Sequence, residues 1–375
     1  QCRKAHFRAL VPLVTQSPSD ASIRKDFETC ADMYISRINQ NTAWFDQIEI
    51  LSDHEALNGR PGARGYEALN WDTSAGFPYN TSKRNFIVGT PGDYKLTEEL
   101  QAKVDYLEDQ LFVRNYHVVF STSLKDEVIS EKKLLASKYR VFMASPIEFT
   151  VILRKYMLCI ARIMQLYPFT FGAAVGVNPN SIQWEQIAEH LGYGQGYKIF
   201  DGDYVDFDKN MRSDITNAVQ RVLLSMLSHH PGFNDQQDWG YHQMYRHILN
   251  VIFHPVVNYF GTFILFESLN PSGNSLTTQI NCIANNLFVR YAFMKKFCSG
   301  MDAQHAECHF NQMVRVMTYG DDLLVGVRCD FSCSDMQTIL HDIGIKFTDA
   351  NKNDIAEPYS TWDNVTFLKR KFTPF

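Results

Sequence analysis

The chain has 375 residues, of which 45% are hydrophobic and 13% aromatic, and its formal net charge is −5. This composition excludes a disordered chain, and the length exceeds what one compact core needs, so we expect two or three subdomains. The negative net charge excludes a protein that coats nucleic acid through a bulk positive field, although a channel can still be locally basic.

The cysteines and the apolar runs argue against three further classes: disulfide-rich, zinc-binding and membrane-spanning proteins. Eight cysteines without regular spacing favour a reducing compartment over a disulfide framework. His305, Cys308 and His309 lie close together, but no second Cys/His pair follows at finger-like spacing, so we expect no zinc site. No run of about 18 apolar residues occurs, so we expect no membrane span. The chain starts without an initiator methionine or a signal peptide, which is typical of a fragment or a polyprotein product.

The first half of the chain mixes loops with helices. Residues 52–95 are rich in Gly, Pro, Asn and Asp, which predicts loops with short strands. Apolar residues at helical spacing predict helices over residues 98–113 and 147–167. A buried strand is expected over residues 197–203, where an acidic stretch begins.

The second half of the chain has a clearer alternation of apolar runs and turn residues than the first half. Two apolar runs, 313–319 and 323–327, flank Gly320-Asp321-Asp322, which predicts a hairpin with a short acidic turn. The remaining expected elements are helices over 210–228, 236–251, 274–297 and 335–343 and a strand over 365–372. The sum is an α+β fold, with an antiparallel sheet backed by helices and a large, loop-rich region in the first half.

Two acidic groups follow buried strands. Asp321 and Asp322 at a hairpin tip would repel each other unless a cation neutralises them, although Gly and Asp also favour plain surface turns. The second group runs from Asp201 to Asp208, at the end of the strand over 197–203. Two acidic strand ends side by side would suit Mg²⁺, and two such ions about 4 Å apart serve phosphoryl transfer.

From residue 73 to residue 372 the motifs resemble, in order, those of the RNA-dependent RNA polymerase of picornavirus-like positive-strand RNA viruses. The family's first motif is an Asp, four residues, and a second Asp. Asp203 and Asp208 fit this spacing, and so do Asp201 and Asp206, so the register stays open, with the flanking aromatic residues favouring Asp203.

The third motif of that family matches residues 319–322 without change. The resemblance implies that Asp203, Asp321 and Asp322 are catalytic and bind Mg²⁺, for which Mn²⁺ can substitute. It further implies that Lys352, in a segment from 344 to 352 that resembles the fourth motif, protonates the departing pyrophosphate.

The second motif resembles residues 271–281 and is implied to read the ribose. Thr277 and Asn281 are four residues apart and share one helical face. By resemblance they join Asp208 and Ser272 in a network that bonds the 2′-hydroxyl. A site built to bond a hydroxyl rejects the analogue that lacks it, because its polar groups would be left unpaired.

Further motifs imply contacts to the nucleotide and to RNA. A basic run is implied to bind the triphosphate through Lys125, Lys133, Lys138 and Arg140, as cationic clamps do in phosphoryl transfer. One departure is Ile129, where the family often has a basic residue. Template and primer contacts are implied for Thr73, Ser74, Gly273, Lys369 and Arg370.

The resemblance implies a right-hand polymerase with an antiparallel-sheet palm, which has an RRM-like core, and a large fingers region. The expected division is fingers over 1–195, the first palm strand over 196–212, a fingers/palm insertion over 213–265 and palm over 266–372. The family continues with a helical thumb, which we expect to be truncated here after residue 372.

The implied activity is template-directed addition of ribonucleotides to an RNA 3′ end during viral genome replication. The implied partners are RNA template and primer, nucleoside triphosphates, a protein primer and other viral replication proteins, at membrane-associated complexes in the host cytoplasm. Alternatives are a two-metal nuclease or phosphatase, a reverse transcriptase, which usually has a bulky residue where Asp208 stands, and an inactive scaffold.

Overall fold

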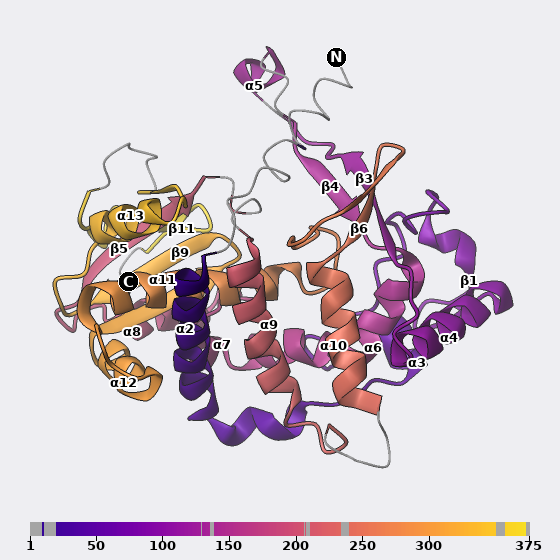
Figure 1. The fold of residues 1–375 in the computed structure, drawn as a ribbon, viewed down its shortest axis with the longest axis horizontal. Coiled ribbons are helices and arrows are strands. Elements are labelled where there is room, and N and C mark those ends of the chain that lie inside the picture. Colours follow the sequence, from indigo (N-terminus) through magenta and orange to yellow (C-terminus); the bar gives the residue numbers. More distant parts are fainter. Residues whose placement is uncertain are drawn as a thin grey trace.

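The computed structural model describes residue 10 and residues 20–128, 130–135, 139–205, 207, 211–233, 240–349 and 357–372. Its architecture is α+β, as the sequence predicts, with two four-stranded sheets lying toward opposite sides of the view in Figure 1. Within these described ranges, no helix has both the length and the apolar content needed to span a membrane.

The first sheet, which we call the palm sheet, is fully antiparallel and has the strand order β10-β5-β9-β8. The chain forms it from β5 (Lys198–Tyr204), the hairpin of β8 (Val314–Tyr319) and β9 (Asp322–Val327), and the short β10 (Phe347–Thr348). The expected acidic hairpin is therefore confirmed. Gly320 has a φ of 62°, and this left-handed conformation in the two-residue turn favours glycine.

Alternating side chains of the palm sheet enter two separate cores, because successive residues of a strand face opposite sides. Phe200 and Val325 pack in the main core together with Phe288 of helix α11 (Thr277–Phe297). Ile199 and Leu324 pack in the smaller core on the other face. That core also receives side chains from α8 (Ile182–His190) and from the last strands of the chain.

Four further helices contribute side chains to the main core. They are α2 (Ala21–Asn39), α9 (Ser213–Leu227), α12 (Ala303–Met313) and α13 (Cys333–Asp342). Helix α2 packs against α9, α11 and α12, so the beginning of the chain is built into the same body as the palm sheet.

The second sheet, which we call the fingers sheet, has the order β4-β3-β6-β7 and was not expected from the sequence. Its strands are β3 (Val119–Leu124), β4 (Val141–Ala144), β6 (Val256–Tyr259) and β7 (Thr262–Leu265). The β3–β6 pair is parallel, whereas the other two pairs are antiparallel. Helices α4 (Glu98–Phe112), α6 (Ile147–Leu166) and α10 (Gly240–Phe253) lie below it in Figure 1.

The remaining elements are short. They are η1 (Thr42–Gln47), α3 (Asp53–Asn58), η2 (Lys83–Phe86), β1 (Ile87–Thr90), β2 (Asp93–Leu96), α5 (Glu131–Leu135), α7 (Pro168–Phe171), β11 (Thr366–Phe367) and β12 (Arg370–Lys371). The β1–β2 pair confirms short strands within residues 52–95.

The single strand expected over 365–372 is wrong in its extent. Leu368 and Lys369 adopt φ values of 51° and 60°, so the chain reverses there and forms a two-stranded hairpin. Two successive left-handed residues match the twist of a two-residue hairpin turn. Lys369 and Arg370, for which primer contacts are expected, lie in this hairpin.

Candidate active site at the ends of strands β5 and β9

The palm sheet brings the two acidic groups of the sequence together. Strands β5 and β9 pair antiparallel, and their ladder ends with Gly202 opposite Leu323. Asp203 and Asp322 each lie one residue beyond that last pair, at the same end of the ladder, and Asp321 lies in the adjoining hairpin turn. On its other side Asp203 pairs with Thr348 of β10.

The carboxylates are close enough to repel one another. The pKa of Asp322 is raised to about 6, mainly because the surrounding protein displaces water from it and then because Asp321 and Asp203 carry like charges. Lys369 acts in the opposite direction. A cation at this strand end would relieve the repulsion.

Among the described residues, no three His, Cys, Asp or Glu side chains converge closely enough to hold a metal ion by themselves. A divalent ion such as Mg²⁺ does not require an all-protein cage, because it is usually held by one or two carboxylates together with substrate phosphates and water. The three carboxylates are hard oxygen donors of the kind that this ion prefers.

Asn285 holds the acidic turn and was missed in the sequence. This fully buried residue of α11 directs its Nδ2 group at the backbone carbonyls of Gly320, Asp321 and Asp322, at 3.1, 3.1 and 3.4 Å. Its Oδ1 accepts a hydrogen bond of 2.9 Å from the hydroxyl of Tyr204 on β5. One side chain therefore connects the hairpin tip with the strand that carries Asp203.

Two adjacent asparagines, Asn285 and Asn286, within an apolar stretch of α11 could have signalled this role, because buried amides need partners. Cys282, one turn earlier, adds to the same support. Its sulfur accepts a hydrogen bond of 3.1 Å from the backbone N–H of Gly320.

Asp201 has a different environment from Asp203, although both side chains face the same side of β5. Asp201 is 6% exposed. Its carboxylate accepts hydrogen bonds from the Ser360 hydroxyl at 2.7 Å and from the backbone N–H of Thr366 at 3.1 Å. Asp201 thus anchors the segment that leads into the β11–β12 hairpin.

The residues of the second motif form a compact loop at the start of α11. The Ser272 hydroxyl accepts a hydrogen bond of 3.2 Å from the backbone N–H of Met143, and the Thr277 hydroxyl donates to the Pro271 carbonyl at 3.1 Å. Asn281 accepts a bond of 2.8 Å at Oδ1 from Asn270. Asp208, their expected partner, lies outside the described residues.

Gly273 lies directly against the fingers sheet. A Cβ atom at this position would come within 2.2 Å of the Met143 carbonyl oxygen, which is a backbone atom that cannot move aside. Gly273 also forms an isolated parallel bridge with Ala144. Glycine is therefore required where the second motif meets strand β4.

Comparison with known proteins decides the family. The family model described as "Viral RNA-dependent RNA polymerase" matches residues 14–374. The chain belongs to this family.

The relatives of this polymerase chain are viral polyproteins. It is 26% identical over 369 residues to the replicase polyprotein of Drosophila C virus (strain EB), covering 94% of the chain and 21% of that protein. It is 28% identical over 346 residues to the genome polyprotein of Deformed wing virus, covering 86% of the chain and 12% of that protein. The chain thus spans about a fifth or less of these relatives' length, and its expected likeness to picornavirus-like polymerases is confirmed.

A solved structure confirms the right-hand polymerase fold. The chain matches "Sicinivirus 3Dpol RNA dependent RNA polymerase" with a TM-score of 0.75 and 23% identity. The match covers 96% of this chain and 69% of that one.

The expected triphosphate residues of this polymerase chain are only partly described. Lys125 and Arg140 pair where β3 and β4 lead into their connecting loop, and the Lys125 N–H donates to the Arg140 carbonyl at 2.9 Å. Glu127 lies 3.8 Å from the Lys125 ammonium and 3.6 Å from the Arg140 guanidinium. Lys138, Ile129 and the side chain of Lys133 lie outside the described residues.

The expected template residues Thr73 and Ser74 lie beside a buried lysine. Lys83 donates to the Thr73 hydroxyl at 2.5 Å, and burial lowers the pKa of Lys83 to about 8. The Ser74 hydroxyl accepts a hydrogen bond of 3.1 Å from the Gly76 N–H. This loop is therefore held by internal hydrogen bonds.

The expected primer residues are at the β11–β12 turn. Lys369 lies near enough to Asp322 to affect its pKa, whereas Arg370 donates to the Asn180 side chain at 3.1 Å. Lys352 lies outside the described residues. The structure thus gathers Asp203, Asp321, Asp322 and Lys369 at one place.

Proposed function

We propose that this chain is the catalytic body of a viral RNA-dependent RNA polymerase, which transfers nucleoside monophosphate from a nucleoside triphosphate to an RNA 3′-hydroxyl under the direction of a template. The observation that carries the proposal is the β5–β9 pairing, which sets Asp203 beside Asp321 and Asp322 in a chain matched by the family model over residues 14–374.

In this proposal Asp203, Asp321 and Asp322 bind Mg²⁺, with Mn²⁺ able to substitute. Divalent ions, when bound, lower the pKa of an attacking hydroxyl and stabilise the leaving oxygen of a phosphoryl transfer. The raised pKa of Asp322 and the like charges around it support this role. Asp201 is assigned a structural role, because its carboxylate already accepts two hydrogen bonds.

Ribose selection is assigned to Asp208, Ser272, Thr277 and Asn281. The support comes from Asn281, whose Oδ1 already accepts a bond from Asn270. Asn281 therefore presents amide N–H groups to a ligand, which suits the oxygen of a 2′-hydroxyl. A deoxynucleotide would leave those donors without a partner.

The remaining expected residues keep their proposed roles. Lys352 is the general acid for pyrophosphate, and Thr73, Ser74, Gly273, Lys369 and Arg370 contact template or primer. The triphosphate is bound by Lys125, Lys133, Lys138 and Arg140. Since Glu127 lies near both Lys125 and Arg140, an incoming triphosphate would have to share these cations with it.

We assign the fingers to residues 1–195, the first palm strand to 196–212, a fingers/palm insertion to 213–265 and the palm to 266–372. Strands β6 and β7 support the insertion, because they complete a sheet begun by β3 and β4. The proposed setting is viral genome replication in the host cytoplasm at membrane-associated complexes, with a protein primer and other viral replication proteins as partners.

The test is incorporation of labelled UTP on a polyadenylate template with an oligouridylate primer, with and without Mg²⁺. Extension that needs template, primer and Mg²⁺ is expected from the wild type and not from Asp321→Asn. Asp342→Asn, at an exposed carboxylate in the last turn of α13, is the matched control and should extend normally. Undiminished extension by Asp321→Asn would refute the assignment.

A second assay addresses ribose selection. Single-nucleotide incorporation of UTP and deoxy-UTP should favour UTP in the wild type, and Asn281→Ala should lose much of that preference. An unchanged ratio in Asn281→Ala would remove Asn281 from the selection network.

A further inference from the structure

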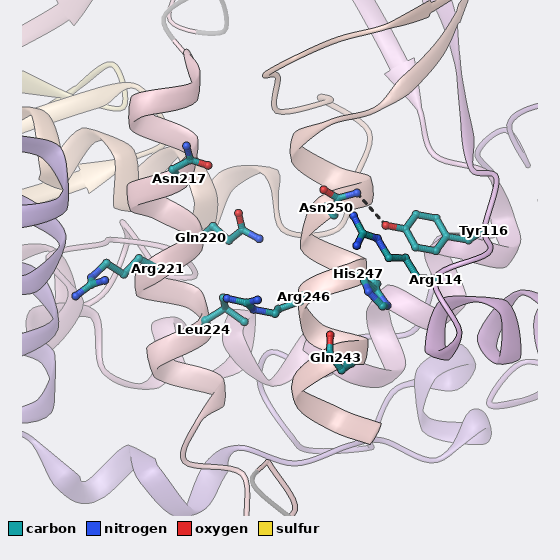
Figure 2. A pocket seen from close by; sticks show the side chains of 10 residues that line it. All are labelled: Arg114, Tyr116, Asn217, Gln220, Arg221, Leu224, Gln243, Arg246, His247 and Asn250. Carbon is teal, nitrogen blue, oxygen red and sulfur yellow. Dashed lines mark hydrogen bonds between the residues drawn. The ribbon is translucent and has the colours of Figure 1, made fainter. Parts of the chain in front are cut away.

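Helices α9 and α10 border a pocket of about 500 Å³ that contains none of the proposed active-site residues. Except for Leu224 of α9, its lining is polar on both helices (Figure 2). Asn217 and Gln220 lie three residues apart on α9, and Arg246, His247 and Asn250 follow helical spacing on α10. We call this feature the α9–α10 pocket.

The polar side chains that line the α9–α10 pocket differ from the apolar side chains that usually fill the space between two packed helices. Both helices bury apolar side chains on their other faces, including Val219 and Val222 on α9 and Ile248 and Leu249 on α10. A facing pair of helices in a folded protein usually continues such an apolar stripe. Since amides and arginines occupy these positions instead, the pocket suits a polar ligand.

Two arginines of the pocket, Arg114 and Arg246, have no partner among the residues that the structure describes. The guanidinium groups of Arg114 and Arg246 make no hydrogen bond or ion pair with any described residue, and no described residue lining the pocket is acidic. Arg221 differs, because its Nε donates to Asp32 at 2.6 Å and its side chain points away from the other lining residues in Figure 2. Within the part of the chain that the structure describes, the positive charge of Arg114 and Arg246 is therefore uncompensated, in a chain of net charge −5.

The backbone conformation of Arg114 is a second sign that its guanidinium serves the pocket. Arg114 follows the end of α4 with a φ of 57°, a left-handed conformation that usually selects glycine or asparagine after a helix. An arginine at this position gives up local stability and supplies a guanidinium to the pocket.

The wall opposite α9 is held in place by hydrogen bonds. Asn250 donates to the Tyr116 hydroxyl at 2.8 Å, and Nδ1 of His247 lies 2.5 Å from the Leu111 carbonyl, to which it donates (Figure 2). The rings of Tyr116 and His247 are 5.7 Å apart. An aromatic ring is thus fixed next to Arg114 in the α9–α10 pocket (Figure 2).

We propose that the α9–α10 pocket binds single-stranded RNA, with Arg114 and Arg246 contacting phosphates and Tyr116 contacting a base. Arginine matches phosphate oxygens with paired donors, aromatic rings stack on unpaired bases, and amide side chains bond base edges. The lining positions of α9 extend over about 10 Å along the helix, which is longer than one phosphate. An acidic peptide would use the arginines and leave the amides and the ring without a role.

This inference rests on the proposed function only for the kind of nucleic acid, since the binding itself does not involve the acidic strand ends. RNA bound here would be held apart from the nucleotide-addition chemistry. The experiment below therefore reads binding at Tyr116 and needs no polymerase activity.

The experiment crosslinks an oligouridylate of about ten nucleotides that contains 4-thiouridine and maps the modified peptides. Wild type, Asp321→Asn and Lys103→Gln should all give a crosslinked peptide that contains Tyr116. Lys103 is the matched control, because it is an exposed cation already paired with Glu99 at 2.7 Å. Arg114→Gln with Arg246→Gln should lower the crosslink by about tenfold, and Arg246→Lys should retain most of it.

Fluorescence anisotropy of the same RNA against KCl concentration gives a second readout. The dependence of log K on log salt should become shallower by about 0.7 for each arginine removed. Circular dichroism should show an unchanged melting curve, because both arginines are exposed and make no ion pair with a described residue.

Three results would overturn the proposal: an unchanged Tyr116 crosslink in the double variant, binding of inorganic tripolyphosphate without any RNA crosslink, or displacement of the RNA by polyglutamate as effective as by unlabelled RNA. If the wild type crosslinks at Tyr116 but fails to extend a primer, the proposed function fails and the pocket assignment survives.

Discussion

Two charged clusters beside helix α11 differ in the signs of their charges: one gathers like charges at the proposed catalytic site, and the other is an ion pair that supports the fold. At the tip of β8–β9, Asp321 and Asp322 lie near Asp203, and all three charges have the same sign. Farther along the helix, Arg290 and Glu307 form a buried, bidentate ion pair with distances of 2.9 and 2.8 Å.

The two clusters show that repulsion between like charges is tolerated at the acidic tip, whereas the buried charges of Arg290 and Glu307 are paired. Glu307 is 1% exposed and Arg290 3%, so both charges depend on each other for stability. At the strand ends, the like charges of Asp321 and Asp203 help to raise the pKa of Asp322, and buried hydrogen bonds from Asn285 fix the turn that carries Asp321 and Asp322. Like charges gathered on a rigid support are expected where a cation binds.

The largest effect on activity, with little effect on stability, is expected from Asp322→Asn. Nucleotide addition should fall by about three orders of magnitude, because a metal contact worth several kcal/mol is lost. The melting temperature should rise slightly, since the raised pKa of Asp322 means that its ionised form opposes folding at neutral pH. Primer extension and calorimetry on the same preparation check both, and a clearly lowered melting temperature would contradict the account.

Glu307→Gln should behave in the opposite way. Leaving Arg290 buried without its partner should lower the free energy of unfolding by about 3–5 kcal/mol. The rate per folded molecule should be unchanged, because the pair lies outside the acidic tip. Urea unfolding monitored by fluorescence, with extension assayed at low temperature, tests this; a stable but inactive variant would undo the distinction between the clusters.

Asn285→Ala tests the support of the turn. Removing its bonds to three carbonyls should slow nucleotide addition by about ten- to hundredfold, as losses of residues that orient metal ligands do. The KM for UTP should stay the same, and Mg²⁺ titration should show weaker apparent binding. If only stability changed, with the rate and the Mg²⁺ dependence intact, Asn285 would be purely structural.

The smallest expected effect concerns pH. Because Asp322 has a pKa of about 6, activity should fall as pH drops through that value, when the carboxyl becomes protonated and can no longer bind a cation. Lys369→Gln removes the charge that lowers this pKa, so the midpoint of the pH profile should move up by roughly half a pH unit or less. A midpoint that moved down in Lys369→Gln would reverse the assigned interaction.

Prediction from sequence succeeded where chemistry is local and failed where it depends on distant segments. The hairpin and its acidic turn follow from two apolar runs around Gly320. Spacing alone left Asp201 and Asp203 equivalent, because the partners that engage Asp201 come from Ser360 and Thr366, far along the chain.

The same reason explains the missed features. Asn285 resembles any polar helical residue until the hairpin carbonyls are near it. The fingers sheet depends on the parallel pairing of β3 with β6. These strands have six and four residues, which is too short for a clear alternation of apolar and polar residues. Long-range pairing of short strands is not readable from local pattern.

The central claim is that Asp203 and the Asp321–Asp322 turn share bound divalent ions, and iron-directed cleavage tests it most directly. Fe²⁺ with ascorbate cuts the backbone next to bound metal, so cuts should occur both at the end of β5 and at the β8–β9 tip. Mg²⁺ should suppress both cuts together, and Asp322→Asn should abolish both. Cleavage at only one of the two segments, or cuts that Mg²⁺ does not suppress, would contradict a shared site.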